Sequence, residues 1–210
     1  MIKNFLFIKD IIKIKLGINR ILPISASIDL TELCNLKCSM CNLWQKKEKS
    51  FTLTPAILEK QFSTSKFLKN LYVVNFGGGE PFLINNLEEY IYPFYKYSKC
   101  SQIRIVTNGY LTDRIIKKTK ELLKLFNTEI GIKISIDGMK EIHNKIRGNP
   151  NAFDNGIKTA EKLKEIKNET KNRLNISLGF TINSLNYNQI VDVFELSKKI
   201  GIGFLAKPII

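Results

Sequence analysis

Three cysteines, Cys34, Cys38 and Cys41, lie within eight residues of the chain. Thiolates bind soft metals in tetrahedral sites or in iron–sulfur clusters, and three in one short segment need little chain entropy to converge. A structural zinc site needs a fourth ligand, for which Cys100 or His143 is a candidate. A [4Fe–4S] cluster needs none if a small molecule binds the last iron. The three-then-two spacing is unlike that of zinc ribbons and favours iron–sulfur, but the ligands alone leave both sites open.

Glycines and polar side chains that suit a bound small molecule recur further along the chain. The glycines of segment 77–79 permit close approach of a backbone, and Glu80 adds a carboxylate that suits an ammonium group. Asn108-Gly109 and Asp137-Gly138 follow two other apolar runs. Each of these segments is also compatible with an ordinary turn at the end of a strand.

Apolar runs predict six strands, over residues 24–30, 71–76, 103–107, 130–136, 174–182 and 203–210. Helices are predicted between them, from Thr54-Pro55 onward, over 86–99, over 112–126, after Pro150, and over 187–200. This alternation is typical of right-handed βαβ units around a parallel sheet, either a barrel or a doubly wound open sheet. Catalytic and ligand-binding residues are then expected in the loops after the strands, and the cysteines and the glycine segments fall in these loops.

Length and composition indicate one globular domain, because the chain has 210 residues of which 44% are hydrophobic. Four cysteines, three of them clustered, favour a reducing, cytoplasmic location over a disulfide framework. The net charge of +14 is read as compositional bias. Nucleic acid is an unlikely partner, since no pattern of aromatic and basic residues suggests base stacking.

The first 22 residues form a separate segment, predicted to be an amphipathic helix docked on the body. No transmembrane span is expected, because charged residues interrupt every apolar run, and a signal-peptide cleavage site is missing. The main domain then covers residues 23–210. It stops on its sixth strand, which suggests a fragment that lacks a closing C-terminal helix.

The cysteine segment CNLKCSMC resembles the signature of the radical S-adenosylmethionine (SAM) superfamily. Its surroundings, TELCNLKCSMCNLW with Trp44, are most similar to the branch of peptide-modifying (SPASM) maturases and MoaA-like molybdenum-cofactor enzymes. GGGEPFL, IVTNGYL, ISIDG and HNKIRGNPNAF follow in the family's order. The resemblance covers residues 24–210 and implies an α/β fold, a partial (βα)6 TIM-like barrel.

The resemblance also implies the roles of particular residues. Cys34, Cys38 and Cys41 would bind three irons of a [4Fe–4S] cluster, and the amino and carboxylate groups of SAM would chelate the fourth. The backbone of Met40 matches a position that lies along the adenine, although many relatives have an aromatic residue there. Gly77 replaces a threonine that is common in the family.

Other matched positions are implied to contact SAM. Gly78, Gly79 and Glu80 resemble the motif that holds the amino group. Ser135 and Asp137 match positions near the ribose hydroxyls, and Arg147 matches one that pairs with the SAM carboxylate. Asn108 is a candidate for the pocket wall.

The implied activity is reductive cleavage of SAM to a 5′-deoxyadenosyl radical that abstracts hydrogen from a substrate. The substrate is a peptide or small molecule, and an electron donor such as flavodoxin or ferredoxin is the expected partner. The alternatives are a truncated, catalytically incomplete core and a non-catalytic metal-binding module. No cysteine follows Cys100, so a second cluster has no ligands here. His143 is expected at the surface or in a cap, Cys100 in packing, and Trp44 at the substrate mouth or as a loop anchor.

Overall fold

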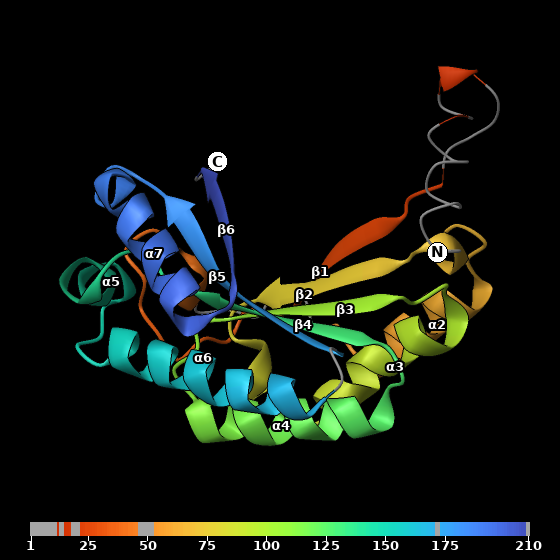
Figure 1. Cartoon of the computed structure of the whole chain (residues 1–210). Coiled ribbons are helices and arrows are strands. Elements are labelled where there is room, and N and C mark those ends of the chain that lie inside the picture. Colours follow the sequence, from red (N-terminus) through yellow and green to blue (C-terminus); the bar gives the residue numbers. More distant parts are fainter. Residues whose placement is uncertain (1–11, 13–14, 18–21, 46–52, 171–172, 209–210) are drawn as a thin grey trace.

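The computed structural model describes residues 12, 15–17, 22–45, 53–170 and 173–208. Six parallel strands form one sheet in sequential order, which confirms the predicted partial barrel. The sheet is curved but not closed, and β1 and β6 are its two edge strands (Figure 1). The strands are β1 (Ser25–Thr31), β2 (Val73–Gly78), β3 (Gln102–Thr107), β4 (Glu129–Ser135), β5 (Leu174–Ile182) and β6 (Gly203–Pro208). Each lies within two residues of its predicted bounds.

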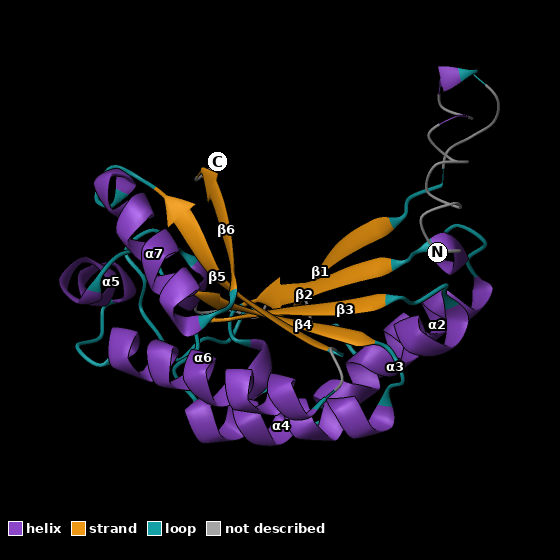
Figure 2. Cartoon of the chain, viewed as in Figure 1, coloured by secondary structure: helices purple, strands orange, loops and turns teal. Residues whose placement is uncertain are grey.

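The helices lie on the outer, convex side of the sheet (Figure 2), and no described element covers the concave side. Five of them follow the prediction: α2 (Pro55–Thr64), α3 (Leu87–Tyr97), α4 (Thr112–Leu125), α6 (Ala152–Glu169) and α7 (Ile190–Ile200). Thr54 begins α2 as expected, since its hydroxyl accepts a hydrogen bond from the Ile57 backbone N–H at 3.3 Å.

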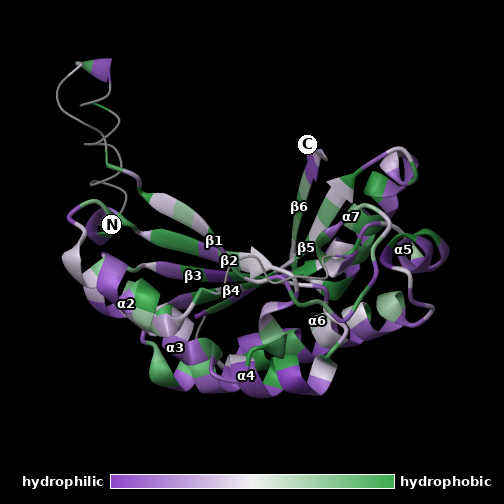
Figure 3. Ribbon diagram, turned by 180° about the vertical axis from the view of Figure 1, so that it is seen from behind, coloured by the Kyte–Doolittle hydropathy of each residue, from purple (hydrophilic) through white to green (hydrophobic). Residues whose placement is uncertain are grey.

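The alternation of residues along the strands separates the two faces of the sheet. In β4, Ile130, Ile132 and Ile134 are buried in the core under the helices, while Lys133 and Ser135 point to the opposite, concave face. The helices carry both apolar and polar stretches, as the hydropathy colours of α3, α4 and α6 show in Figure 3. The concave face of the sheet is therefore open and carries polar side chains.

One helix was not predicted. The segment Lys140–Arg147, for which the sequence indicated no helix, forms α5, which buries His143, Ile146 and Arg147. Gly148 ends it in the left-handed conformation with φ of 64°. The prediction that His143 lies at the surface is therefore wrong, because the side chain is completely buried and its ring packs edge-on against Phe153.

The N-terminal segment 1–22 lies mostly outside the described residues, so its predicted helix stays a prediction. Within the described ranges, no helix is long and apolar enough to cross a membrane.

Candidate functional site

A cavity of about 140 Å³ at the carboxyl ends of the strands brings the three cysteines together. Cys34, Cys38 and Cys41 come from the loop after β1, and the glycine segment at the end of β2 lies beside them. The expectation that the unusual residues gather at one end of the sheet is confirmed. Cysteines apart, the wall is formed by Leu36, Met40, Leu43, Trp44, Gly77, Gly78, Gly79, Val106, Thr107, Asn108, Ser135 and Arg147.

The glycine segment packs directly on the chain that leads into the cysteine loop. The Gly79 N–H donates to the Thr31 carbonyl at 2.6 Å, and the Glu80 N–H donates to the Leu33 carbonyl at 2.8 Å. A Cβ atom at Gly79 would overlap the Leu33 carbonyl, and one at Gly78 would overlap that of Thr31. Gly78 also has φ of 104°, a conformation that other residues rarely adopt. Glycine is required here by the contact between the two loops.

Glu80 is fully buried and does not line the cavity. Its carboxylate accepts hydrogen bonds from the Thr107 hydroxyl at 2.8 Å, the Asn108 N–H at 2.8 Å and the Phe82 N–H at 3.1 Å. Burial raises the pKa of this carboxyl, and the hydrogen bonds from Asn108, Thr107 and Phe82 act in the opposite direction. Glu80 thus joins the end of β2 to the end of β3.

Asn108 extends this connection to the cysteine loop. Its amide nitrogen donates to Asn35 Oδ1 at 2.8 Å and lies 3.8 Å from Cys34 Sγ. Its amide oxygen accepts from the Tyr110 N–H at 2.9 Å, which fixes the orientation of the amide. The expected pocket-wall residue is therefore in place, and its amide N–H faces a thiol.

Arg147 connects the cysteine loop to the end of β4. It pairs with Asp137 through Nη2, and its Nη1 lies 3.7 Å from Cys38 Sγ. Asp137 is fully buried, is not part of the cavity wall, and also accepts from the Thr181 N–H at 2.8 Å. Burial raises the pKa of the Cys38 thiol, while the charge and hydrogen bond of Arg147 lower it. Arg147 therefore favours the thiolate form that a metal needs.

Two further contacts fix the loop itself. The Trp44 indole N–H donates to the Cys38 carbonyl at 3.1 Å, and the Ser39 N–H donates to the Ile146 carbonyl at 2.8 Å. Trp44 thus anchors the loop and also lines the cavity.

Asn183, after β5, lies 3.6 Å from Met40 Sδ. Sequence reasoning missed Asn183, whose position directly after a strand was the available signal.

The donor set fits an iron–sulfur cluster better than a closed zinc cage. Within the described part of the chain, no three Cys, His, Asp or Glu side chains are arranged to hold a single metal ion. In a [4Fe–4S] cluster each thiolate binds a different iron, so convergence on one atom is not needed. Cys100, which packs against the core just before β3, lies at the other end of the sheet from the cysteine loop. The Nδ1 atom of His143 already accepts from the Asp137 N–H at 3.0 Å.

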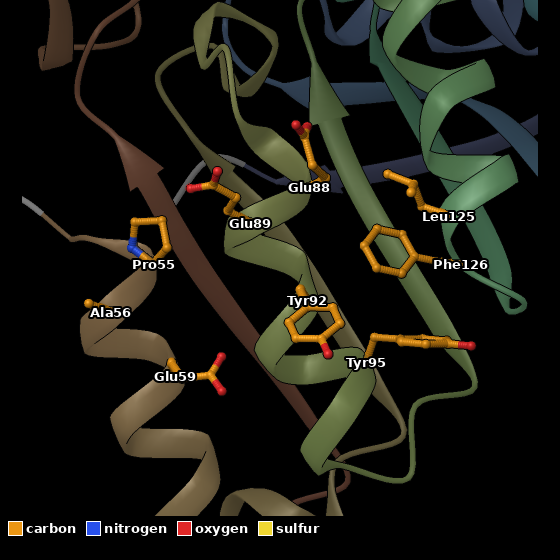
Figure 4. Close-up of a pocket in the computed structure, with 9 residues that line it drawn as sticks. All are labelled: Pro55, Ala56, Glu59, Glu88, Glu89, Tyr92, Tyr95, Leu125 and Phe126. Carbon is orange, nitrogen blue, oxygen red and sulfur yellow. The ribbon is translucent and has the colours of Figure 1, made fainter.

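A hollow of about 530 Å³ lies elsewhere, between α2 and α3 on the outer surface (Figure 4). Its carboxylates are engaged: Glu59 accepts from the Tyr97 hydroxyl at 2.5 Å, and Glu88 pairs with Lys118 at 3.0 Å. It contains no thiol, so we place the functional site at the smaller, cysteine-lined cavity. The larger hollow between α2 and α3 is lined by Pro55, Ala56, Glu59, Glu88, Glu89, Tyr92, Tyr95, Leu125 and Phe126.

Burial of His143 predicts a pH-dependent stability. Burial, with a smaller contribution from the Arg147 charge, lowers the pKa of His143 to about 3. The unfolded chain binds a proton at this histidine below pH 6.5 and the folded chain does not. The free energy of unfolding should therefore fall between pH 6.5 and 3, by at most about 1.4 kcal/mol per pH unit from this group.

Urea unfolding of the iron-free protein at pH 7.5 and 5.5 measures this effect. His143→Asn retains an acceptor for the Asp137 N–H but does not titrate in this range, so its stability should change less between the two pH values. An equal change in both proteins would show that His143 does not carry the dependence.

The radical SAM superfamily model matches residues 28–197. The bacteriocin biosynthesis protein AlbA of Bacillus subtilis is 30% identical over 69% of this chain and 31% of its own length. A GTP 3′,8-cyclase of Sulfurimonas denitrificans is 26% identical over 83% of this chain and 52% of its own length. The structure of Streptococcus suis SuiB bound to S-adenosylmethionine has a TM-score of 0.69 and 18% identity over 95% of this chain and 44% of SuiB. The chain thus spans about a third to a half of these relatives.

Proposed function

Because the chain belongs to the radical SAM superfamily, we propose that its thiol-lined cavity binds a [4Fe–4S] cluster and SAM and cleaves SAM reductively. The observation that carries the proposal is the convergence of Cys34, Cys38 and Cys41 with the glycine segment and Arg147 around one cavity. The superfamily, with relatives in MoaA-like and peptide-maturing families, uses this pair of cofactors.

The cavity wall supplies groups for each part of SAM. Three thiolates would hold the cluster, and the charge of Arg147 beside Cys38 opposes the rise in the pKa of this thiol that burial causes. Ser135 offers a hydroxyl for the ribose, and the backbone of Met40 and the Gly78-Gly79 segment offer surfaces for the adenine and the amino group. The guanidinium of Arg147 suits the SAM carboxylate, since its Nε has no partner among the described residues.

Glu80 and Asp137 would act through their neighbours. Glu80 holds Asn108 against the cysteine loop, and Asp137 holds Arg147 beside Cys38. Their carboxylates are fully buried and satisfied by protein donors, so we assign them to positioning instead of direct contact with SAM.

When bound and reduced, the cluster would supply the electron for cleavage of SAM to methionine and a 5′-deoxyadenosyl radical, which would take a hydrogen atom from the substrate. The concave face of the sheet is left for that substrate. A flavodoxin or ferredoxin would serve as electron donor. AlbA is named for bacteriocin biosynthesis and the cyclase for GTP, so a peptide or a small molecule is the proposed substrate.

Anaerobic reconstitution with iron and sulfide tests this function. We expect about four irons per chain, as a [4Fe–4S] cluster requires, and release of 5′-deoxyadenosine when dithionite and SAM are added. Iron content is measured colorimetrically and the nucleoside by chromatography. A chain that loads iron but releases no nucleoside, or that takes up zinc in its place, would contradict the proposal.

A further inference from the structure

The concave face of the sheet carries three cationic side chains, two on the adjacent strands β3 and β4 and one on β6. Arg104 on β3 and Lys133 on β4 alternate with the buried core positions of their strands, and Lys207 on β6 pairs in register with Thr181 of β5. Arg104 and Lys133 line a groove of about 310 Å³, with Leu205 of β6 as another wall. The remaining polar groups in the groove are side chains of Asn75, Gln102, Asn175 and Ser177.

Glycines on the adjacent strands make room for the side chains of Arg104 and Lys133. Arg104 lies across Gly131, where a Cβ atom would be 3.3 Å from Arg104 Cγ. Lys133 lies across Gly179, where a Cβ atom would be 2.9 Å from Lys133 Cδ. Both glycines lie inside strands, where glycine is unfavourable, so the space they leave for the cations is a specific feature of this face.

These cations have no acidic partner in the described part of the chain: none of Arg104, Lys133 and Lys207 forms a salt bridge there. One nearby carboxylate, Glu129, sits at the base of β4 and accepts from the amides of Gln102 and Asn175. Asp29 lies on β1 beside Gly77 of β2.

Repulsion among the positive charges of Arg104, Lys133 and Lys207 makes their placement on one face of the sheet unfavourable. Burial lowers the pKa of Lys133, and the charges of Lys207 and Arg104 lower it further. An anion in the groove would offset both effects, because it would supply the opposite charge that the protein does not.

We propose that this groove is the substrate subsite and that it binds a carboxylate or phosphate group of the substrate through Arg104 and Lys133, with Lys207 at the rim. The inference rests on the proposed function, because it takes the reacting group to lie at the SAM cavity. Val106 lines both hollows. Lys133 precedes Ser135 by two residues on β4, so the backbone position of Lys133 lies about 7 Å along the strand from this cavity-wall residue.

Binding of two probes to the full chain, inorganic pyrophosphate and glutarate, tests the subsite. Isothermal titration calorimetry at constant ionic strength, without SAM or reductant, should show binding of at least one probe. Pyrophosphate binding more tightly identifies a phosphate-bearing substrate, and glutarate binding more tightly identifies a carboxylate. Lys133→Gln and Arg104→Gln should each weaken the tighter probe about tenfold, the effect of one lost charged hydrogen bond.

Two further variants separate the subsite from general attraction to a basic protein. Gly179→Ala keeps the net charge but displaces Lys133, so it should also weaken binding, and it remains informative if a charge-removing variant fails to fold. Lys162→Gln removes an exposed lysine on α6 that pairs with Asp113, and binding should be unchanged.

Two outcomes overturn the inference: neither probe binds, or Lys162→Gln weakens binding as much as Lys133→Gln does. If these occur while the wild-type chain releases 5′-deoxyadenosine, the proposed function stands and only the anion subsite is lost. Specific anion binding by a chain that loads iron but does not cleave SAM contradicts the proposed function and the assignment of the groove to its substrate, and leaves only the anion site.

Discussion

Cys38→Ala is expected to abolish 5′-deoxyadenosine release and to prevent assembly of a stable four-iron cluster. Cys38 is the most buried of the three cysteines and the one beside Arg147. Its removal leaves two thiolates for a cluster that needs three from the protein. Iron content, the visible absorption of the cluster and nucleoside release under dithionite and SAM are the measurements. Nucleoside release at the wild-type rate would remove Cys38 from the site.

The matched control is Cys100→Ala. Cys100 is the fourth cysteine, packs against the core before β3, and does not line the cavity. This variant should load the same iron as the wild type and release the nucleoside at a similar rate. If both variants lost iron equally, the defect would come from general loss of folding instead of loss of a ligand.

Arg147→Met is expected to lower the free energy of unfolding of the iron-free protein by about 3–5 kcal/mol, the usual cost of removing one partner of a buried ion pair. Methionine fills much of the same volume but leaves the Asp137 carboxylate buried without its cation. The Cys38 thiol also loses the charge that lowers its pKa, so iron loading should require a higher pH. Urea unfolding and iron uptake at several pH values measure the two effects.

Lys140→Met provides a control on the same helix. Lys140 pairs with Asp154 at 2.7 Å, but both side chains are more than half exposed. Surface pairs contribute little, so this variant should change the unfolding free energy by less than about 1 kcal/mol. An Arg147→Met protein as stable as Lys140→Met would show that the buried pair does not support the fold.

The strands and five helices could be predicted because their apolar residues recur with clear periodicity. Ile130, Ile132 and Ile134 alternate with small or polar residues, and α4 repeats its apolar positions at helical spacing. Helix α5 was missed because two of its buried residues, His143 and Arg147, are types usually found outside. Their spacing with Ile146 and the stop at Gly148 were the available signals.

Most of the residues predicted for the site line one cavity, but the direction of the two predicted carboxylates could not be read from the sequence. The cysteine spacing and the order of the motifs brought the right segments to one cavity. Glu80 and Asp137 were expected to face SAM, yet the structure turns both toward backbone N–H groups and Arg147. Their partners lie between 2 and 44 residues away in the sequence, and no local pattern specifies which donors will be nearest.

The hydrogen bonds from Glu80 to Leu33 and from Ser39 to Ile146 attach the cysteine loop to the body on two sides. A loop held in this way is largely preorganised before any metal arrives, so little conformational entropy remains to be lost on metal uptake. Cluster affinity should then depend on residues that never touch iron, because loosening either attachment would move that ordering cost to the step in which the metal binds.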